Sequence, residues 1–138
     1  MSARFESVTG GCFCGAIRYE AEANSKEAYF CHCKGCQKRT GTPAHVGVFV
    51  NPESLTYNED GVSMFQTSSF GFSYFCKTCG SRVIWKCPDH PEWTNVAVGT
   101  LDHPEHAVPV RHICVESQIP WYQPFDDLPK ERCDEDSA

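Results

Sequence analysis

The segment Phe75-Cys76-Lys77-Thr78-Cys79-Gly80 places two cysteines three positions apart and follows them with a glycine. It lies between two stretches, residues 71–76 and 82–86, whose composition predicts short strands. Glycine permits the tight turn that brings backbone N–H groups close to metal-bound sulfur. The pattern therefore predicts a turn between two strands that presents two thiolates to a metal ion.

Two further cysteine clusters occur nearer the N-terminus, Cys12-Phe13-Cys14-Gly15 and Cys31-His32-Cys33-Lys34-Gly35-Cys36. Together the three clusters contain seven of the ten cysteines. Small tetrahedral sets of soft thiolates favour zinc over magnesium, calcium or manganese. Seven ligands suit one closed four-thiolate site and one three-thiolate site with an open fourth position, which is where zinc chemistry takes place.

We expect two zinc ions, one structural and one catalytic. The structural ion is expected to be held by the two cysteine pairs, Cys12, Cys14, Cys76 and Cys79. The catalytic ion is expected to be held by the middle cluster, Cys31, Cys33 and Cys36. Spacing alone leaves other partitions open, and His32 or His45 as a fourth ligand would close the second site. Because His32 lies between two ligands, we expect its side chain to point away from the metal.

The other cysteines are interpreted without disulfides. The sequence has no apolar stretch of signal-peptide or membrane-spanning length, so the expected compartment is the cytoplasm, where patterned cysteines bind metals more often than they form bridges. Cys114 lies in an apolar run and is expected to be a buried thiol. Cys133 lies in a charged C-terminal stretch, where we expect no role for it.

The remaining sequence predicts one small all-β domain. Apolar residues alternate over 16–22 and 44–50, as in half-buried strands, and residues 34–40 form the one helical stretch. We expect residues 1–9 to be an N-terminal extension, residues 10–129 the zinc-binding domain and residues 130–138 an acidic tail. The domain is expected to consist of short antiparallel sheets with at most one short helix, stapled by zinc.

The charge of the chain limits its partners. Its formal net charge is −6 at pH 7, and thiolates bound to zinc would make it more negative. Nucleic acids and anionic membranes attract clustered Lys and Arg side chains. We therefore expect no nucleic-acid partner and no membrane partner.

The motifs Gly11-Cys12-x-Cys14-Gly15-x-Ile17-x-Tyr19, Cys31-His32-Cys33-x-x-Cys36 and Phe75-Cys76-x-x-Cys79-Gly80 resemble the glutathione-dependent formaldehyde-activating enzyme family. The resemblance runs from about residue 10 to residue 125. It implies a zinc-stapled β-tent fold and a carbon–sulfur lyase of the S-(hydroxymethyl)glutathione synthase type. It also implies the same division of ligands into a structural and a catalytic set.

The resemblance leads us to expect a small-molecule thiol, glutathione foremost, and a small electrophile such as an aldehyde as substrates. Anionic substrate groups would need positive partners, and the cations considered are Lys34, Arg39, Arg82 and Arg111. Relatives of the same domain include a microtubule-binding centromere protein. Two other functions therefore stay open, a non-catalytic protein-binding module and a zinc reservoir.

Three residues near the C-terminus complete the set considered for the site. His112 is either a proton shuttle or a packed strand histidine. Trp121 and Tyr122 are expected either to wall a substrate pocket or to pack in the core.

Overall fold

The computed structural model describes residues 5–123 and 126–133 of the chain. Its ten strands join in one sheet in the order β10-β9-β2-β3-β8-β7-β6-β5, and β1 and β4 also pair with β2. The strands are β1 (Phe5–Gly11), β2 (Arg18–Cys31), β3 (His45–Val50), β4 (Thr56–Tyr57), β5 (Val62–Gln66), β6 (Phe72–Cys76), β7 (Arg82–Lys86), β8 (Asn95–Ala97), β9 (Val108–Ile113) and β10 (Lys130–Glu131).

Helical structure is scarce among these residues. The single α-helix is α1 (Lys34–Thr40), at the position predicted from the sequence. The short 3-10 helices are η1 (Glu59–Gly61), η2 (Pro91–Trp93), η3 (Val98–Thr100), η4 (Pro104–His106) and η5 (Val115–Ser117). No described helix has the length and hydropathy to span a membrane. The all-β class with one short helix is confirmed.

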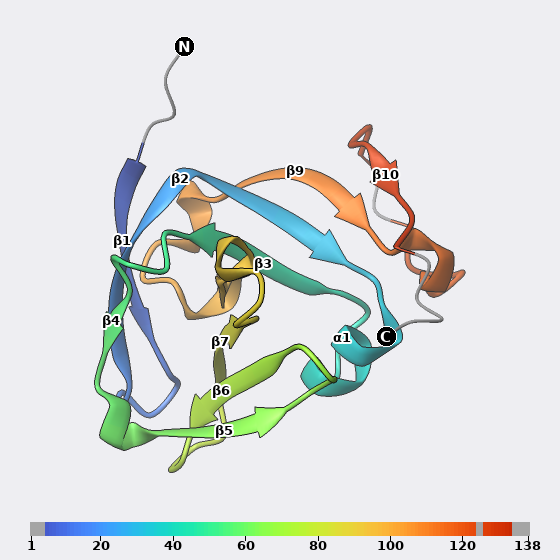
Figure 1. Ribbon diagram of the computed structural model, residues 1–138. Helices are drawn as coiled ribbons and strands as arrows, with labels where there is room; N and C mark the ends of the chain where they lie inside the picture. The colour runs from blue at the N-terminus through green and yellow to red at the C-terminus, as the bar shows by residue number, and fades with distance from the viewer. Residues whose placement is uncertain (1–4, 124–125, 134–138) are drawn as a thin grey trace.

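The sheet bends strongly along its length. In Figure 1, β2, β3 and β9 lie along the upper side, β5 and β6 lie along the lower side, and α1 lies on the right between the two. The bend brings the turn between β1 and β2 toward the turn between β6 and β7, although three strands separate β2 from β6 in the sheet order. This arrangement places the distant cysteine pairs within reach of each other.

The sheet is less regular than the expected set of short antiparallel pairs. Strand β2 is 14 residues long, and β9 pairs with both β2 and β10 in parallel. The register between β2 and β3 shifts between Ala23 and Ala28. Because this irregularity interrupts the alternation of apolar residues, the pattern over 16–22 did not predict that the strand continues to Cys31.

Both flanks contribute to the fold. Strand β1 begins at Phe5, inside the expected N-terminal extension, and pairs with β2 over its whole length. In the expected acidic tail, β10 pairs with β9, and Cys133 forms a disulfide with Cys114. The interpretation of these two cysteines as unbridged was therefore wrong. Their pairing depends on a contact between segments 19 positions apart, which cysteine spacing does not reveal.

The main core lies against β1, β2, β3 and the β6–β8 strands. Its fully buried side chains include Ile17, Val48 and Val96, and the hydroxyl of buried Tyr19 lies 2.8 Å from Thr100 Oγ1. A smaller buried cluster, which contains Tyr29, Cys31, Cys36 and Cys114, lies at the far end of β2. The middle cysteine cluster is thus set into its own apolar surroundings.

Replacing Val48 with alanine is expected to lower the free energy of unfolding by about 2–3 kcal/mol, because the change deletes two methyl groups and leaves a cavity in the core. Val108→Ala is the matched control, since Val108 also lies in a strand but is 53% exposed. The control is expected to cost less than about 1 kcal/mol. Urea unfolding of zinc-loaded protein measures both values, and equal losses would contradict this description of the core.

Candidate metal centres

The first cysteine cluster joins two turns that are far apart in the sequence. Cys12 and Cys14 lie in the turn between β1 and β2, whereas Cys76 ends β6 and Cys79 lies in the turn before β7. The four sulfur atoms lie within 4.8 Å of one another. The Sγ atoms of Cys12 and Cys14 are 3.6 Å apart, and those of Cys14 and Cys76 are 3.7 Å apart. Zinc–sulfur bonds of about 2.3 Å in a tetrahedron require sulfur separations of about 3.8 Å, so the cluster fits zinc.

Backbone amides support the thiolate form of this cluster. Ile17 N donates to Cys12 Sγ at 3.1 Å, and Cys79 N donates to Cys76 Sγ at 3.4 Å. Hydrogen bonds of this kind favour the charged form of a sulfur ligand. Gly80 has φ of 80°, and its N–H closes the turn onto the carbonyl of Cys76 at 2.9 Å. The glycine after each cysteine pair thus permits the left-handed conformation that a side chain would disfavour.

The second cluster lies where β2 passes into α1. Cys31 ends β2, Cys33 caps the N-terminus of α1, and Cys36 lies in the first turn of the helix. Their sulfur atoms lie within 4.8 Å of one another. Cys33 Sγ accepts the Cys36 N–H at 3.2 Å, so one sulfur serves both as helix cap and as possible ligand. Cys31 and Cys36 are 6% and 4% exposed, which leaves Cys33 as the more accessible member.

The three thiols compete for negative charge. Hydrogen bonds from Cys31 and Cys36 hold the pKa of Cys33 far down, at about 2. Hydrogen bonds to Cys33 and Cys36, together with burial, raise the pKa of Cys31 well above its usual range. Arg39 Nη2 donates to Cys36 Sγ at 3.0 Å and offsets part of the charge. A bound divalent cation would let all three sulfurs ionise together, so this donor set fits a metal.

The nearby histidines have other partners. His32 Nε2 lies 2.8 Å from Nδ1 of His112, whose Nε2 lies 3.0 Å from Asp126 Oδ2. His45 Nε2 lies 3.0 Å from Asn95 Oδ1. Burial lowers the pKa of both His32 and His45. His112 is 1% exposed, so it is packed in the strand, and it links buried His32 to the partly exposed carboxylate of Asp126. These contacts hold His32, the residue between Cys31 and Cys33, in place.

A third group of possible metal ligands, His103, Glu105 and His106, was not singled out in the sequence. Its three ligand atoms lie within 4.8 Å of one another, but all three residues are exposed. Glu105 Oε2 already lies 3.1 Å from His103 Nδ1 and 3.7 Å from His106 Nε2. The only signal in the sequence was two histidines separated by two residues. This group contains no thiolate and lies on η4 and on the residue that precedes it.

A basic pocket adjoins the second cluster. Its volume is about 490 Å³, and its lining residues are Lys38, Arg39, Phe65, Phe75, Gly80 and Arg82. Arg39 links the pocket to the cluster through its bond to Cys36. Burial and, next, the nearby charge of Arg39 lower the pKa of Arg82. The pocket therefore combines three cations with two aromatic side chains, which suits an anionic organic molecule.

Two of the four cations considered from the sequence, Arg39 and Arg82, line this pocket, and Lys38 was missed as a lining residue. Arg111 lies on β9, where its Nε is 3.8 Å from Glu131 Oε2. Lys34 starts α1 and does not line the pocket.

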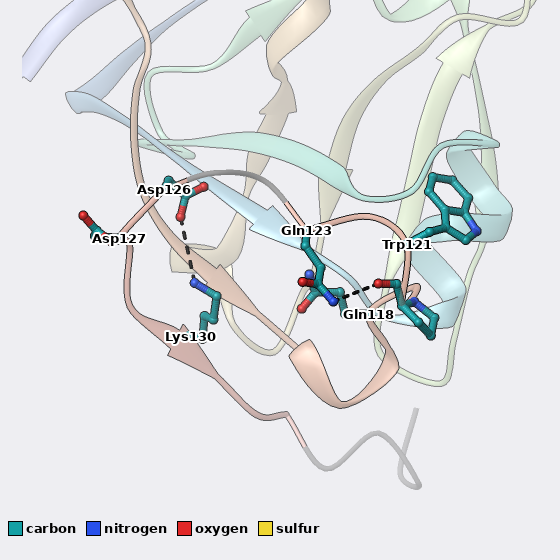
Figure 2. Close-up of a pocket in the computed structure, with 7 residues that line it drawn as sticks. Gln118, Trp121, Gln123, Asp126, Asp127 and Lys130 are labelled. Carbon is teal, nitrogen blue, oxygen red and sulfur yellow. Dashed lines mark hydrogen bonds and ion pairs between the residues drawn. The ribbon is translucent and has the colours of Figure 1, made fainter.

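A larger cavity lies over the C-terminal segment. Its volume is about 860 Å³, and its lining residues are Gln118, Pro120, Trp121, Gln123, Asp126, Asp127 and Lys130. Figure 2 shows the Asp126–Lys130 ion pair on one side of it and the bond from Gln123 to the Pro120 carbonyl. Trp121 lines this cavity and is 75% exposed, whereas the Tyr122 ring packs 5.9 Å from that of His32. No cysteine lines this cavity, so it is separate from the thiol clusters.

Known proteins resemble this chain in sequence and in structure. A protein from Schizosaccharomyces pombe, named as an uncharacterized lyase, is 32% identical over 76 residues. The aligned residues are 55% of this chain and 55% of the relative, so the chain spans about half the length of the curated relative it matches. The crystal structure of a Rhodobacter sphaeroides protein aligns with a TM-score of 0.58 at 20% identity, over 88% of this chain and 98% of that one. The structural likeness shows a shared fold.

The family comparison covers more of the chain. The model of the glutathione-dependent formaldehyde-activating enzyme family matches residues 7–117, a range that contains both thiol clusters and the basic pocket between them. The chain therefore belongs to the glutathione-dependent formaldehyde-activating enzyme family.

Proposed function

We propose that this protein is a zinc-dependent carbon–sulfur lyase or synthase that joins or cleaves a thiol and a small aldehyde. The leading substrates are glutathione and formaldehyde, which the family name suggests, and the name of the Schizosaccharomyces pombe relative supports a lyase reaction. The observation that carries the proposal is the second cluster, in which three cysteine sulfurs converge beside a basic pocket. The reaction is proposed for the cytoplasm, where the glutathione pool would supply the thiol substrate and would also set the oxidation state of an exposed disulfide.

The two thiol clusters would have different roles. Cys12, Cys14, Cys76 and Cys79 provide four sulfurs, which would fill all the ligand positions of a zinc ion and leave none for substrate. Cys31, Cys33 and Cys36 provide three. A zinc ion bound there would supply a fourth position that holds an incoming thiol in its ionised, nucleophilic form.

The basic pocket would bind and orient the thiol substrate. Glutathione carries two carboxylates, and the guanidinium groups of Arg39 and Arg82 match the planar geometry of a carboxylate. Phe65 and Phe75 provide the apolar part of the wall and exclude water beside the sulfur. Because Arg39 also contacts Cys36, a carboxylate held by these arginines lies close to the three-sulfur cluster.

Exchanging Cys33 for serine is expected to abolish turnover and to reduce bound zinc from about two ions to about one, because the second cluster keeps too few thiolates. The chain is expected to stay folded, since the other cluster is intact. Mass spectrometry of the metal measures the zinc content, and circular dichroism measures the fold. Product formation from glutathione and formaldehyde measures turnover.

Cys14→Ser is the matched control, because it removes a thiol from the structural set. We expect it to lower the melting temperature far more than Cys33→Ser does. Loss of the whole fold in Cys33→Ser would contradict the division into structural and catalytic sites. A wild-type protein that exchanges its second zinc but forms no product with any aldehyde would instead favour the zinc reservoir.

Substituting Arg82 with glutamine is expected to raise the KM for glutathione about tenfold, the equivalent of one lost hydrogen bond to a charged group. The KM for 2-mercaptoethanol, which has no carboxylate, should change little, and kcat should change less than KM. Arg111→Gln is the control, since Arg111 lies outside the pocket. Equal increases of KM for both thiols would contradict a carboxylate-binding role, and initial rates at several salt concentrations provide the comparison.

A further inference from the structure

A fourth sulfur lies against the second thiol cluster. Cys114 Sγ is 3.8 Å from Cys31 Sγ, and Cys114 is 6% exposed. It packs in the same buried group as Cys31 and Cys36. The proposed function uses only the three cysteines of the motif and gives this fourth one no role.

Cys114 forms a disulfide with Cys133, which occupies the sulfur atom that would otherwise be able to bind a metal. Cys133 is exposed, and its N–H donates to the carboxylate of Glu116 at 3.0 and 3.2 Å. The parallel pairing of β10 with β9 carries Cys133 to this place beside the end of β9. The disulfide thus has one sulfur at the cysteine cluster and the other in an exposed residue.

We propose that Cys114 is a redox-controlled fourth ligand of the second metal site. The inference rests on the proposed binding of zinc by Cys31, Cys33 and Cys36. While the disulfide is intact, Cys114 is committed to Cys133, and the fourth metal position is open to substrate. When the disulfide is reduced, the Cys114 thiolate takes that position and closes the site.

The geometry supports this assignment. A tetrahedral zinc site with four sulfurs has sulfur separations of about 3.8 Å, which the Cys31–Cys114 distance matches. Cys114 also has φ of 58°, the one positive value among the described residues other than glycine. Such a conformation is disfavoured in a residue with a side chain and persists where the surroundings require it. It lies here at the end of β9, next to the cluster.

The reduction step balances with a low-molecular-weight thiol as reductant. One thiolate attacks the exposed Cys133 sulfur, forms a mixed disulfide and releases Cys114 as a thiolate. A second thiolate attacks the mixed disulfide, releases Cys133 and leaves as the oxidised disulfide of the small thiol. Two electrons pass from the two small thiols to the protein disulfide. The Cys133 sulfur takes up a proton, whereas the Cys114 sulfur stays ionised on the metal.

Two variants separate the ligand from the disulfide. Both Cys133→Ser and Cys114→Ser lack the disulfide, but only Cys133→Ser retains the Cys114 thiol. Loss of even an indirect partner of a metal ligand costs about 10- to 100-fold in metal affinity. We therefore expect Cys133→Ser to hold the second zinc at least about tenfold more tightly than Cys114→Ser, as measured by competition with a chelator.

Cobalt substitution of the full chain gives a second readout that does not depend on turnover. The absorption bands of Co²⁺ bound by four sulfurs differ from those of Co²⁺ bound by three sulfurs and an oxygen. We expect both Co²⁺ ions to be bound by four sulfurs in Cys133→Ser, and only one of the two in Cys114→Ser. Oxidised wild type should have the spectrum of Cys114→Ser, and it should acquire the spectrum of Cys133→Ser on treatment with a phosphine reductant, which contributes no thiol. If Cys114→Ser fails to fold, wild type and Cys133→Ser still provide this comparison.

The outcomes also separate this inference from the proposed function. If every variant binds two metal ions with the same affinity and spectrum, Cys114 is not a ligand, and the proposed function is unaffected. If wild type and both variants bind only the metal of the first cluster, the second metal site fails, and both proposals are overturned. A Cys31–Cys114 disulfide found by peptide mass spectrometry in metal-loaded wild type would also overturn the inference, because it would show exchange rather than ligation.

Discussion

The fold depends on bringing four cysteine sulfurs together from two turns that the sequence separates by more than sixty positions. Cys12 and Cys14 follow β1, whereas Cys76 and Cys79 lie between β6 and β7. Closing a loop of this length has a large entropic cost, and four close thiolates repel one another. One metal ion bound by all four sulfurs would offset both terms and would stabilise the bend of the sheet around this point.

The same bent sheet also determines where the second thiol cluster lies. Because β2 continues for 14 residues, it carries the chain from the first thiol cluster to Cys31 at the far end of the molecule. There α1 begins on Cys33, and the helix brings Arg39 and Lys38 toward side chains of β5, β6 and β7. The basic pocket is therefore built from α1 on one side and from β5, β6 and β7 on the other, and Gly80 places it next to the turn that carries Cys76 and Cys79.

The sequence predicted the turns and the helix, because residues close together in the chain determine them. The spacing of Cys76, Cys79 and Gly80 identified the turn, and the helix over 34–40 lies where the pattern placed it. The parts that were missed depend on contacts distant in the sequence. The parallel pairing of β2 with β9 and the placement of Lys38 in the pocket require the folded sheet, and no spacing rule contains them.

The Cys114–Cys133 disulfide also depends on a contact that is distant in the sequence, and this contact affects the chemistry of the second thiol cluster. An isolated cysteine in an apolar strand is usually a buried thiol, and only the return of β10 beside β9 gives Cys114 a partner. The same return places this sulfur against Cys31. A sulfur at that distance has two stable partners, the exposed cysteine and a metal ion held by its neighbours. Because the Cys114 sulfur cannot bind Cys133 and the metal at the same time, reduction of the disulfide and closure of the open metal position are coupled to each other.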